Sequence, residues 1–486
     1  WKTFKHCLLE SAITSANTLF IIGTSTLFTY VLVKEGASAE IASFILGISQ
    51  NPAVILLIIN VVLLILGISG CAAKTIDEMY ALPRMSERNS NLRASIENSM
   101  EGRGYAAPLS GSNQESVQTA DLNGDGKEEY LIFTKSTQGE ELQILVFGQL
   151  EDSHYGLLET IDCKGSSFEQ VQYASVDDSP GSELIVGTQL NEKVTRTVSI
   201  YSFASGQAEK IKSMVYERLL VCDLNGDGRS ELMVIQNGDS EFSNAAVRLY
   251  SFSDGHMSGS AEARLSVPPE YIRRMTLSKL SGGKPAVYVS SAFIDNTVVT
   301  DILSLRDGIF TNISHMGDLE ITMRPVHNCM VYAEDLDGDG VLELPSLTAM
   351  TYNTTEQNLI RWFAVDADAG AETRLYTFHN FDDGWYIRIN ESWVDRIAVE
   401  KNGSTYTFYM WNNNYGSAVP VFTIFAFTGK DRDSQAAVQN RFALHRGEDV
   451  VFSAKLESGS AIYGVTENYL QSNFHLIRQG WRATES

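Results

Sequence analysis

The chain has 486 residues, of which 44% are hydrophobic and 20% are charged, and its formal net charge is −23. This length exceeds what one hydrophobic core normally serves, so we expect two or more folded units. Residues 1–70 contain three Lys and three Glu, so the net negative charge belongs to the remainder. Such an acidic surface repels nucleic acid and anionic lipid headgroups and attracts cations, which excludes nucleic acid as an expected partner.

Residues 1–70 predict a membrane segment with two hydrophobic spans. Residues 11–33 and 41–70 contain no charged side chain, and the stretch NPAVILLIINVVLLILGISG is almost continuously aliphatic. Both stretches are long enough to cross a bilayer. A transmembrane hairpin is therefore the simplest interpretation, and a buried helix pair in a soluble protein is the alternative.

The same segment resembles part of a known transporter. Residues 1–67, above all ANTLFIIGTSTLFTYVLV and ISQNPAVILLIINVVLLILG, are similar to the C-terminal part of the large permease subunit of TRAP-type dicarboxylate transporters. The resemblance implies a membrane component that is accessory to solute transport. A working permease of that family needs many more spans to enclose a substrate site, so we do not expect this chain to transport alone.

The second span ends in ILGISGCAAK, where Ile68, Ser69 and Gly70 precede Cys71. This stretch resembles the lipobox of bacterial lipoproteins, which implies cleavage after Gly70 and lipidation of Cys71. The alternative is an ordinary cysteine just after a helix. The absence of Lys and Arg between Lys34 and Cys71 favours that alternative, because a signal peptide normally starts with basic residues.

The charges near the N-terminus conflict with this anchor. Lys2 and Lys5 favour a cytoplasmic N-terminus, so two spans would return residue 71 to the cytoplasm, whereas a lipidated cysteine must face outward. Since the sequence opens at Trp1, we expect either a fragment or a junction between a permease-like and a lipoprotein-like segment. In both cases we expect the chain after residue 71 to lie outside a bacterial cell membrane, held by the lipid or by the two spans.

Beyond the anchor, one unit recurs along the chain. Residues 71–113 predict a spacer with a short helix, for which Ser86 is the expected N-cap. From 114 to 384, DLNGDGKEEYLIF at 121 recurs as DLNGDGRSELMVI at 223 and DLDGDGVLELPSL at 335, and weaker copies start at 177 and 279. The starts are separated by 56, 46, 56 and 56 residues, which indicates a structural repeat.

Each unit predicts strands, with alternating or continuously apolar stretches such as ELQILVFGQL and AAVRLYSFSDG after the acidic loop. Four-stranded repeats of this length favour a mainly β fold, a β-propeller of five blades with up to seven left open, because radial stacking buries both faces of each sheet. The pattern resembles the FG-GAP and VCBS-type repeats of integrin-α-like β-propellers. That resemblance implies calcium loops at hairpins within the blades.

Three of the acidic loops predict calcium sites. Calcium takes six to eight oxygen ligands, and alternating ligands in a tightly turned loop all point inward. Position 1 is an aspartate, positions 3 and 5 are Asn or Asp, position 7 offers a backbone carbonyl, and a glutamate closes the shell at position 9. The predicted ligands are Asp121, Asn123, Asp125, Lys127 and Glu129; Asp223, Asn225, Asp227, Arg229 and Glu231; and Asp335, Asp337, Asp339, Val341 and Glu343.

The spacing excludes an EF-hand, whose closing carboxylate stands at position 12. Ile132, Val234 and Ser346 occupy that position here. A turn rich in Asp, Asn and Gly that binds no metal is the remaining alternative. The recurrence of the same closing glutamate in three copies favours up to three Ca²⁺ sites that stabilise their hairpins by screening the carboxylates from one another.

Residues 385–486 predict a separate small α+β domain. Strands flank an Asn402–Gly403 turn, and TENYLQSNFHLI predicts a closing helix. Trp385, Trp393, Trp411 and Trp481 would form either a ligand platform or, as is usual at strand spacing, part of the core.

No catalytic motif is present: GxSxG and HExxH are absent, and the eight histidines do not cluster in the sequence. Cys222 and Cys329 are expected to be buried core residues, and one disulfide among Cys163, Cys222 and Cys329 is left open. We therefore expect a chain that is not an enzyme. The expected function is that of a membrane-anchored, calcium-binding surface module whose loops bind protein or glycan, an expectation that rests partly on fold analogy.

Overall fold

The computed structural model describes residues 87–481 except 140, 151–154, 191–194, 238–244, 294–296, 316–330, 351–356, 412–417 and 479. By internal contacts the chain divides into two compact units, 1–86 and 87–486. The predicted spans, the lipobox and Cys71 all lie outside the described residues. Within the described part of the chain, no helix has the length and apolar character needed to cross a membrane.

The predicted spacer helix is present as α5, Glu87–Ser99. Its Leu92 and Ile96 lie four residues apart and therefore on one face, and Met100 continues that face after the helix ends. These three side chains pack against Ile132 and Phe147 of the first sheet. The end of the spacer thus shares a core with the first β unit.

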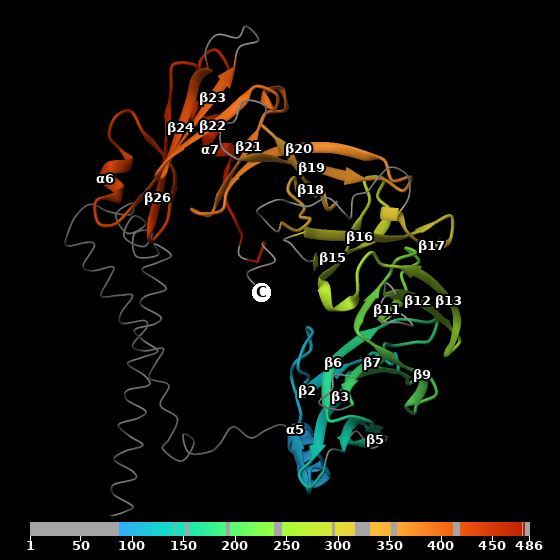
Figure 1. Cartoon of the computed structure of the whole chain (residues 1–486). Coiled ribbons are helices and arrows are strands. Elements are labelled where there is room, and N and C mark those ends of the chain that lie inside the picture. Colours follow the sequence, from blue (N-terminus) through green and yellow to red (C-terminus); the bar gives the residue numbers. More distant parts are fainter. Residues whose placement is uncertain are drawn as a thin grey trace, which may run out of the picture. The chain divides into compact units, whose positions relative to one another are not determined.

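The described residues after this helix form six antiparallel sheets, and within each of the first four the main strands pair in chain order (Figure 1). The first sheet contains β1 (Arg103–Tyr105), β2 (Val117–Ala120), β3 (Glu129–Ser136), β4 (Leu142–Gln149) and β5 (Tyr155–Cys163). The second contains β6 (Ser167–Ala174), β7 (Glu183–Gln189), β8 (Arg196–Ser202) and β9 (Glu209–Tyr216). The third contains β10 (Arg218–Cys222), β11 (Glu231–Gln236), β12 (Ala246–Ser253) and β13 (His256–Arg264).

The fourth sheet contains β14 (Ile272–Lys279), β15 (Pro285–Phe293), β16 (Thr297–Arg306) and β17 (Ile309–Asn312), with the short helices η1 (Pro269–Tyr271) and η3 (Ile313–His315) beside it. The fifth sheet contains β18 (Leu344–Ala349), β19 (Asn358–Val365), β20 (Ala371–Asn380), β21 (Trp385–Ile389) and, from the end of the chain, β27 (Phe474–Leu476). The mainly β, propeller-like architecture expected from the repeats is confirmed in these sheets.

The sixth sheet runs in the order β22 (Ile397–Asn402), β23 (Thr405–Trp411), β24 (Ala418–Thr428), β26 (Val450–Leu456) and β25 (Phe442–Arg446). The short helices η5 (Glu391–Trp393), α6 (Arg432–Ala436) and α7 (Glu467–Asn473) accompany it. The boundary expected at residue 385 falls directly before β21, and β21 pairs with β20 of the fifth sheet.

Neighbouring sheets share hydrophobic cores, because successive side chains of a strand point to opposite faces. In β11, Met233 and Ile235 pack toward the fourth sheet, whereas Leu232 and Val234 pack toward the second. The same alternation recurs in β7 and β15. Central strands of the repeats are thus buried on both faces, as the continuously apolar stretches predicted.

Most of the tryptophans proposed as a ligand platform belong to the core. Trp385, Trp393 and Trp481 are buried, and they belong to clusters of buried apolar side chains around the fifth and sixth sheets. The core interpretation, which is the usual one for aromatic residues at strand spacing, is therefore confirmed for these three residues. Cys222 is buried as expected, which raises the pKa of its thiol to about 12, and both Cys163 and Cys222 are free. Cys329 lies outside the described residues.

Candidate metal site in the acidic loops

Each acidic loop leads directly into a strand of its sheet, and in the first and third sheets it joins that strand to the preceding one. Residues 121–128 join β2 to β3, and residues 223–230 join β10 to β11. Residues 335–343 lead into β18, and the backbones of Glu334 and Glu343 pair at the base of that loop. The repeated sequence therefore gives one loop geometry at equivalent sheet edges.

The aspartate at position 1 organises the turn through its two oxygens. In the third loop, Asp335 Oδ1 accepts from Gly338 N at 2.7 Å and Oδ2 accepts from Gly340 N at 3.0 Å. Asp121 and Asp223 make the equivalent pairs of bonds. Both glycines have φ of +83°, a left-handed conformation that side-chain-bearing residues rarely adopt. The glycines fold the loop so that the ligand side chains converge.

The closing glutamate is fixed by a backbone bond to the apolar residue at position 2. The N–H of Leu336 donates to Glu343 Oε2 at 2.8 Å. The corresponding bonds join Leu122 to Glu129 and Leu224 to Glu231. All three glutamates are buried, and burial raises the pKa of Glu129 and Glu231.

The residue at position 3 distinguishes the third loop from the other two. Asn123 Nδ2 donates to Glu129 Oε1 at 3.2 Å, and Asn225 Nδ2 donates to Glu231 Oε1 at 2.6 Å. In the third loop the residue at that position is Asp337, which offers no N–H.

Glu343 Oε1 is accordingly buried without a hydrogen-bond partner, on a side chain with 0% exposure. Burial, reinforced by the charges of Asp337, Asp339 and Asp335, raises the pKa of Glu343 to about 7. A buried, unpaired carboxylate oxygen is costly unless a cation compensates it.

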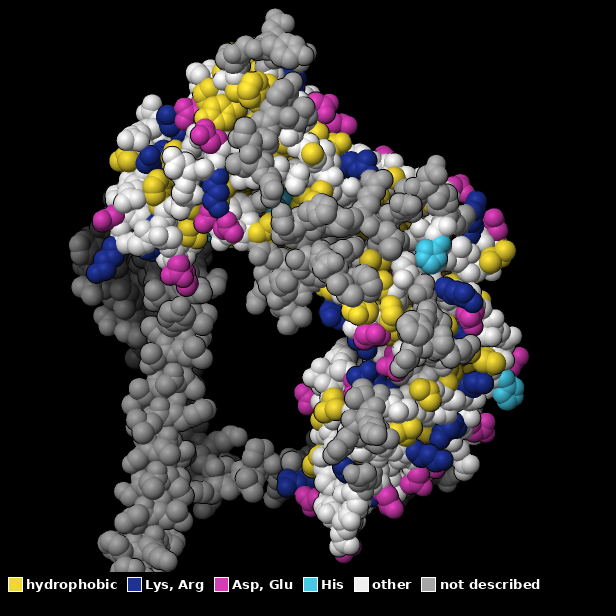
Figure 2. Space-filling view, viewed as in Figure 1, with side chains coloured by type: hydrophobic (Ala, Val, Ile, Leu, Met, Phe, Trp, Pro, Cys, Tyr) yellow, Lys and Arg dark blue, Asp and Glu magenta, His cyan; other side chains and the backbone are white. Residues whose placement is uncertain are grey.

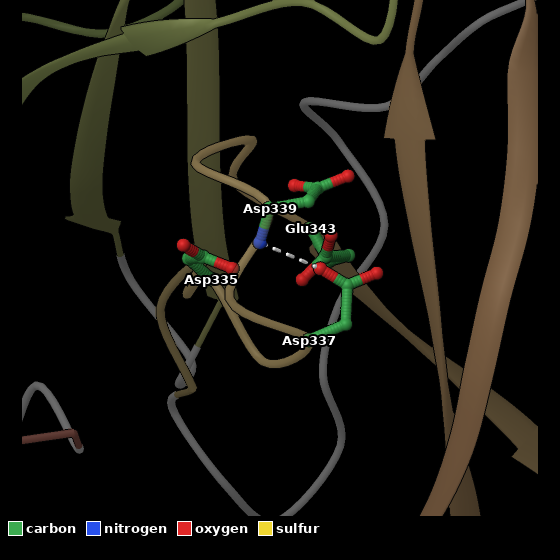
Figure 3. Close-up of side chains that lie close together, drawn as sticks. All are labelled: Asp335, Asp337, Asp339 and Glu343. Carbon is green, nitrogen blue, oxygen red and sulfur yellow. Dashed lines mark hydrogen bonds between the residues drawn. The ribbon is translucent and has the colours of Figure 1, made fainter.

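The third loop gathers four carboxylates around its turn (Figure 3). One oxygen from each of Asp335, Asp337, Asp339 and Glu343 lies within 4.8 Å of the others, close enough for a single metal ion. Among the described residues, no other group of three or more Asp, Glu, His or Cys side chains brings its ligand atoms within this distance of one another. The orphaned Glu343 oxygen fits a cation ligand. The structure therefore supports a metal site here, without identifying the metal.

In the loop at 223 a guanidinium lies beside one predicted ligand. Arg229 Nη2 lies 3.0 Å from Asp227 Oδ2, and Arg229 also pairs with Asp178. Slight burial of Asp227 favours its neutral form, but hydrogen bonds from Arg229 and Asn225 outweigh this and lower the pKa of that carboxyl.

The carbonyl role at position 7 stays a prediction. The backbone N–H groups of Lys127, Arg229 and Val341 donate to the position-5 aspartates.

The weaker copy that the sequence placed at Asp177 makes the same bond to its closing glutamate, two residues out of the expected register. Val176 N donates to Glu183 Oε2 at 2.9 Å, so the unit assigned to Asp177 begins in register at Ser175. Here Asp177 Oδ2 accepts from Gly255 N at 2.8 Å, a contact from the third sheet. The signal in the sequence was the seven-residue spacing between a buried apolar residue and a glutamate.

Neighbouring loops contact each other in chain order. Ser182 N donates to Asp121 O at 3.1 Å, and Ser230 N donates to Ser175 O at 2.8 Å. Further along, Ser278 Oγ donates to Gly340 O at 3.0 Å. The metal-site loop is thus fixed on one side by the fourth sheet.

A second polar cluster surrounds the fully buried Asp301. Its carboxylate accepts from Ser266 N at 2.9 Å, Ser266 Oγ at 2.6 Å and Asn312 Nδ2 at 2.8 Å. Ser266 Oγ also lies 2.9 Å from His315 Nε2. Asp301 and Ser266 approach the same ring nitrogen, whereas in a Ser-His-Asp triad they contact opposite nitrogens of the imidazole.

Comparison with known families gives one match, confined to the N-terminus. The family described as "Tripartite ATP-independent periplasmic transporter, DctM component" matches residues 1–80. This match agrees with the permease resemblance of residues 1–67, and it covers too little of the chain to assign the whole protein to the family. No curated protein matches the chain.

Solved structures that match include the exotype rhamnogalacturonan lyase YesX, at 12% identity over 66% of this chain and 65% of that chain, with a TM-score of 0.27. They also include CoXyl43, a GH43 β-xylosidase/α-arabinofuranosidase from a compost microbial metagenome, at 13% identity over 56% and 97% of the two chains (TM-score 0.23). TolB from Acinetobacter baumannii matches at 9% identity over 76% and 70% (TM-score 0.22). The chain spans less than two thirds of the length of YesX.

Similarities this distant transfer no functional residue. The sheets and the loop geometry place the described chain in a class of mainly β, propeller-like proteins with an acidic loop able to bind a metal. The expectation that the chain is not an enzyme is corrected, because the matching structures include rhamnogalacturonan lyases and a glycosidase. The absence of a familiar catalytic motif from the sequence does not exclude catalysis.

Proposed function

We propose that residues 87–486 form a calcium-binding, propeller-like domain of a membrane-anchored protein that lies outside a bacterial cell and binds protein or glycan through its loops. The buried, partnerless Oε1 of Glu343 carries the calcium proposal, because it lies among three aspartates on a side chain with no exposure. Four carboxylates without a cation would repel one another in a site shielded from water.

The donor set favours calcium over softer metals. All four side chains offer oxygen, and the backbone carbonyl of Val341 is the proposed fifth ligand, whereas zinc sites in proteins generally use Cys or His. Calcium also tolerates the irregular geometry of a flexible loop better than magnesium, which requires near-ideal octahedral coordination. The loops at 121 and 223 are proposed as weaker sites, since an asparagine replaces one carboxylate in each.

Calorimetric titration and thermal melting of the full chain test the metal proposal. Calcium should bind and raise the thermal midpoint, and at about 100 times the Kd it should add about 2.7 kcal/mol to the unfolding free energy. Glu343→Gln should remove the tightest site, while Glu372→Gln, an exposed glutamate on β20, should leave the titration unchanged. Equal titrations for Glu343→Gln and the wild type would refute calcium binding at this loop.

The surface-module proposal rests on the composition and on the lipobox-like stretch before Cys71. Acidic and basic side chains are interspersed over the described part of the face in Figure 2, and the whole chain is strongly acidic. Protein or glycan is therefore a better partner than nucleic acid. Binding of the full chain to a glycan array, with calcium and with EGTA, is the direct measurement. If no glycan binds either with calcium or with EGTA, the proposal is restricted to protein partners.

A second candidate function follows from the family match on residues 1–80: a membrane component accessory to TRAP-type solute transport. The intact mass of the membrane-extracted protein, made with and without an inhibitor of the lipoprotein signal peptidase, separates the two. A mature chain that starts at acylated Cys71 would have lost the permease-like segment. A mass that retains residues 1–70 would favour the transport-accessory function.

A further inference from the structure

The C-terminal end of the described chain folds back onto the fifth sheet. Residues 474–478 with 480 and 481, here called the C-terminal strap, follow α7 and begin with β27 (Figure 1). β27 pairs with β21 through Phe474 opposite Ile387 and Leu476 opposite Trp385. The strap ends at Trp481, which is 4% exposed. A terminal segment that buries a tryptophan is held by specific contacts.

An aromatic cradle of the fifth sheet receives that tryptophan. The Trp481 ring stacks on Trp362 with centroids 5.6 Å apart, and it meets Tyr386 edge to face at 5.3 Å. The His379 ring lies 5.1 Å away. Burial of an indole surface with such ring contacts is a large stabilising contribution for a single side chain.

The segment 331–334 that leads into the metal loop forms the other side of the cradle. Trp481 Nε1 donates to Tyr332 O at 3.3 Å, and Tyr332 N donates to Trp481 O at 3.4 Å. Two residues later, Glu334 accepts from Arg478 Nη1 at 2.9 Å. Residues 332 and 334 therefore contact the strap directly.

The same segment reaches the base of the metal loop at Glu334. Glu334 N donates to Glu343 O at 3.1 Å, and Glu343 N donates to Glu334 O at 3.0 Å, so these two residues close the base of the loop. Arg388 of β21, the strand that pairs with the strap, donates to the carbonyl of Leu336 within the loop. The strap therefore reaches the candidate metal site by three routes. Trp481 bonds to Tyr332, Arg478 bonds to Glu334, and β27 pairs with the strand that carries Arg388.

We propose that a divalent cation in the loop 335–343 controls the docking of the C-terminal strap. The proposal rests on the calcium binding proposed above. When the site is empty, the four carboxylates repel one another and the Glu343 oxygen stays unpaired. Both effects strain the two backbone hydrogen bonds between Glu334 and Glu343 at the base of the loop. The segment carrying Tyr332 then loosens and Trp481 leaves its cradle. When calcium binds, the base closes and the strap docks.

Thermodynamic linkage gives this device a reciprocal signature. If calcium favours the docked strap, the docked strap must favour calcium by the same factor. Loss of the strap's aromatic anchor should therefore weaken calcium binding at a site that Trp481 does not touch as a ligand. A purely structural tryptophan would change the thermal stability and leave the calcium affinity unchanged.

Hydrogen exchange of the full chain in calcium and in EGTA tests docking directly. We expect the backbone amides of 331–336 and of the C-terminal strap to lose protection together in EGTA, while β22 and β23 stay protected. In the Glu343→Gln variant both segments should exchange quickly even with calcium present. Because the wild-type protein carries this measurement, the test does not depend on the folding of a variant.

Calcium titration of Trp481→Leu supplies the reciprocal test, with Phe168→Leu as a control. Phe168 is fully buried and packs on Phe133 at 5.1 Å in the core between the first two sheets, remote from the loop in sequence. We expect Trp481→Leu to weaken the site lost in Glu343→Gln by about fivefold or more, the lower end of typical coupling energies. Phe168→Leu should leave the Kd unchanged.

The outcomes separate the two proposals. Suppose that the titration shows the Glu343-dependent site but the strap exchanges at the same rate in calcium and in EGTA. That result would overturn the strap mechanism and leave the metal site intact. The same holds if Trp481→Leu and the wild type bind calcium equally. A titration without any Glu343-dependent site would overturn both.

Discussion

Asn225 donates a 2.6 Å hydrogen bond to the buried Glu231, and this bond has no counterpart between Asp337 and Glu343 in the loop at 335. The two loops are otherwise built alike, with the same aspartate–glycine bonds and the same backbone bond to the closing glutamate. A single amide group thus decides whether the closing glutamate is satisfied by the protein or left for a cation.

Exchanging these residues should exchange the properties of the two loops. In Asp337→Asn, the new amide can donate to Glu343 Oε1, so the metal-free protein should gain about 1 kcal/mol of unfolding free energy. The stabilisation by calcium should fall at the same time, because one ligand charge is lost. Thermal melts in EGTA and in calcium measure both effects. Asn225→Asp should do the opposite, and a change in the same direction for both variants would contradict this account.

The loop at 175 predicts a pH effect at a site with no proposed metal. Glu183 is 1% exposed, and burial followed by the neighbouring charge of Asp177 raises the pKa of its carboxyl. A carboxyl whose folded pKa lies above its unfolded value binds its proton more tightly when folded. The fold therefore gains stability from this group as pH falls through the folded pKa, down to about pH 4.3 where the unfolded carboxyl also protonates.

Glu183→Gln should isolate that effect, because glutamine resembles the protonated acid. The variant should be more stable than the wild type at pH 7, because burial disfavours the ionised form of Glu183. The advantage should shrink on acidification and vanish near pH 4. Denaturant unfolding of both proteins across this range gives the difference, and Glu372→Gln on the surface serves as a control. A stability advantage of Glu183→Gln that grows toward low pH would show that the pKa of Glu183 is not raised in the folded protein.

Much of the repeat architecture could be predicted because its information is local. The continuously apolar sequence of strands such as β11 and the Asp–x–Asn–x–Asp–Gly pattern of the loops each lie within a few residues of sequence. The hairpin around Gly403 was likewise found, since Asn402 pairs with Thr405 across the turn. The continuously apolar strands also correctly predicted sheets that are buried on both faces.

Features that depend on distant contacts were not predictable in this way. The loop at 175 lost its aspartates at positions 1 and 5, and Asp177 instead bonds to Gly255, which is 78 residues away. Trp481 reaches Tyr332 across 149 residues, so nothing beside it in the sequence marks it as a buried anchor. The difference between Asp337 and Asn225 was visible in the sequence, but its consequence for the closing glutamate required the side-chain geometry.

Arg229 predicts a difference between the calcium responses of two loops. Its guanidinium pairs with the proposed ligand Asp227 and with Asp178, and all three side chains are about a third or more exposed. Loss of such exposed pairs costs little in the metal-free protein, because solvent screens them. Arg229→Gln should remove a competing positive charge and strengthen calcium binding at 223–231. Titration in a Glu343→Gln background, where the loop at 335 is silent, measures this gain, and weaker binding in Arg229→Gln would exclude competition.

Two glycines of the first loop allow steric strain to be separated from backbone strain. Gly124 and Gly126 have φ of +74° and +80°, so an alanine at either position meets a similar conformational penalty of about 1–2 kcal/mol. A Cβ at Gly124 would also lie 2.6 Å from Gly181 N in the neighbouring loop, whereas a Cβ at Gly126 meets nothing within 4 Å. Gly124→Ala must therefore push the loops at 121 and 175 apart and disturb the Ser182–Asp121 backbone bond.

We expect Gly124→Ala to destabilise the chain more than Gly126→Ala, by about 1–3 kcal/mol, the usual cost of overpacking. Denaturant unfolding in EGTA provides the comparison without a contribution from calcium. Hydrogen exchange at Ser182 should rise only in Gly124→Ala, because only that variant separates the loops. Equal losses of stability for the two variants would mean that the contact between neighbouring loops contributes little, and that each sheet carries its acidic loop independently.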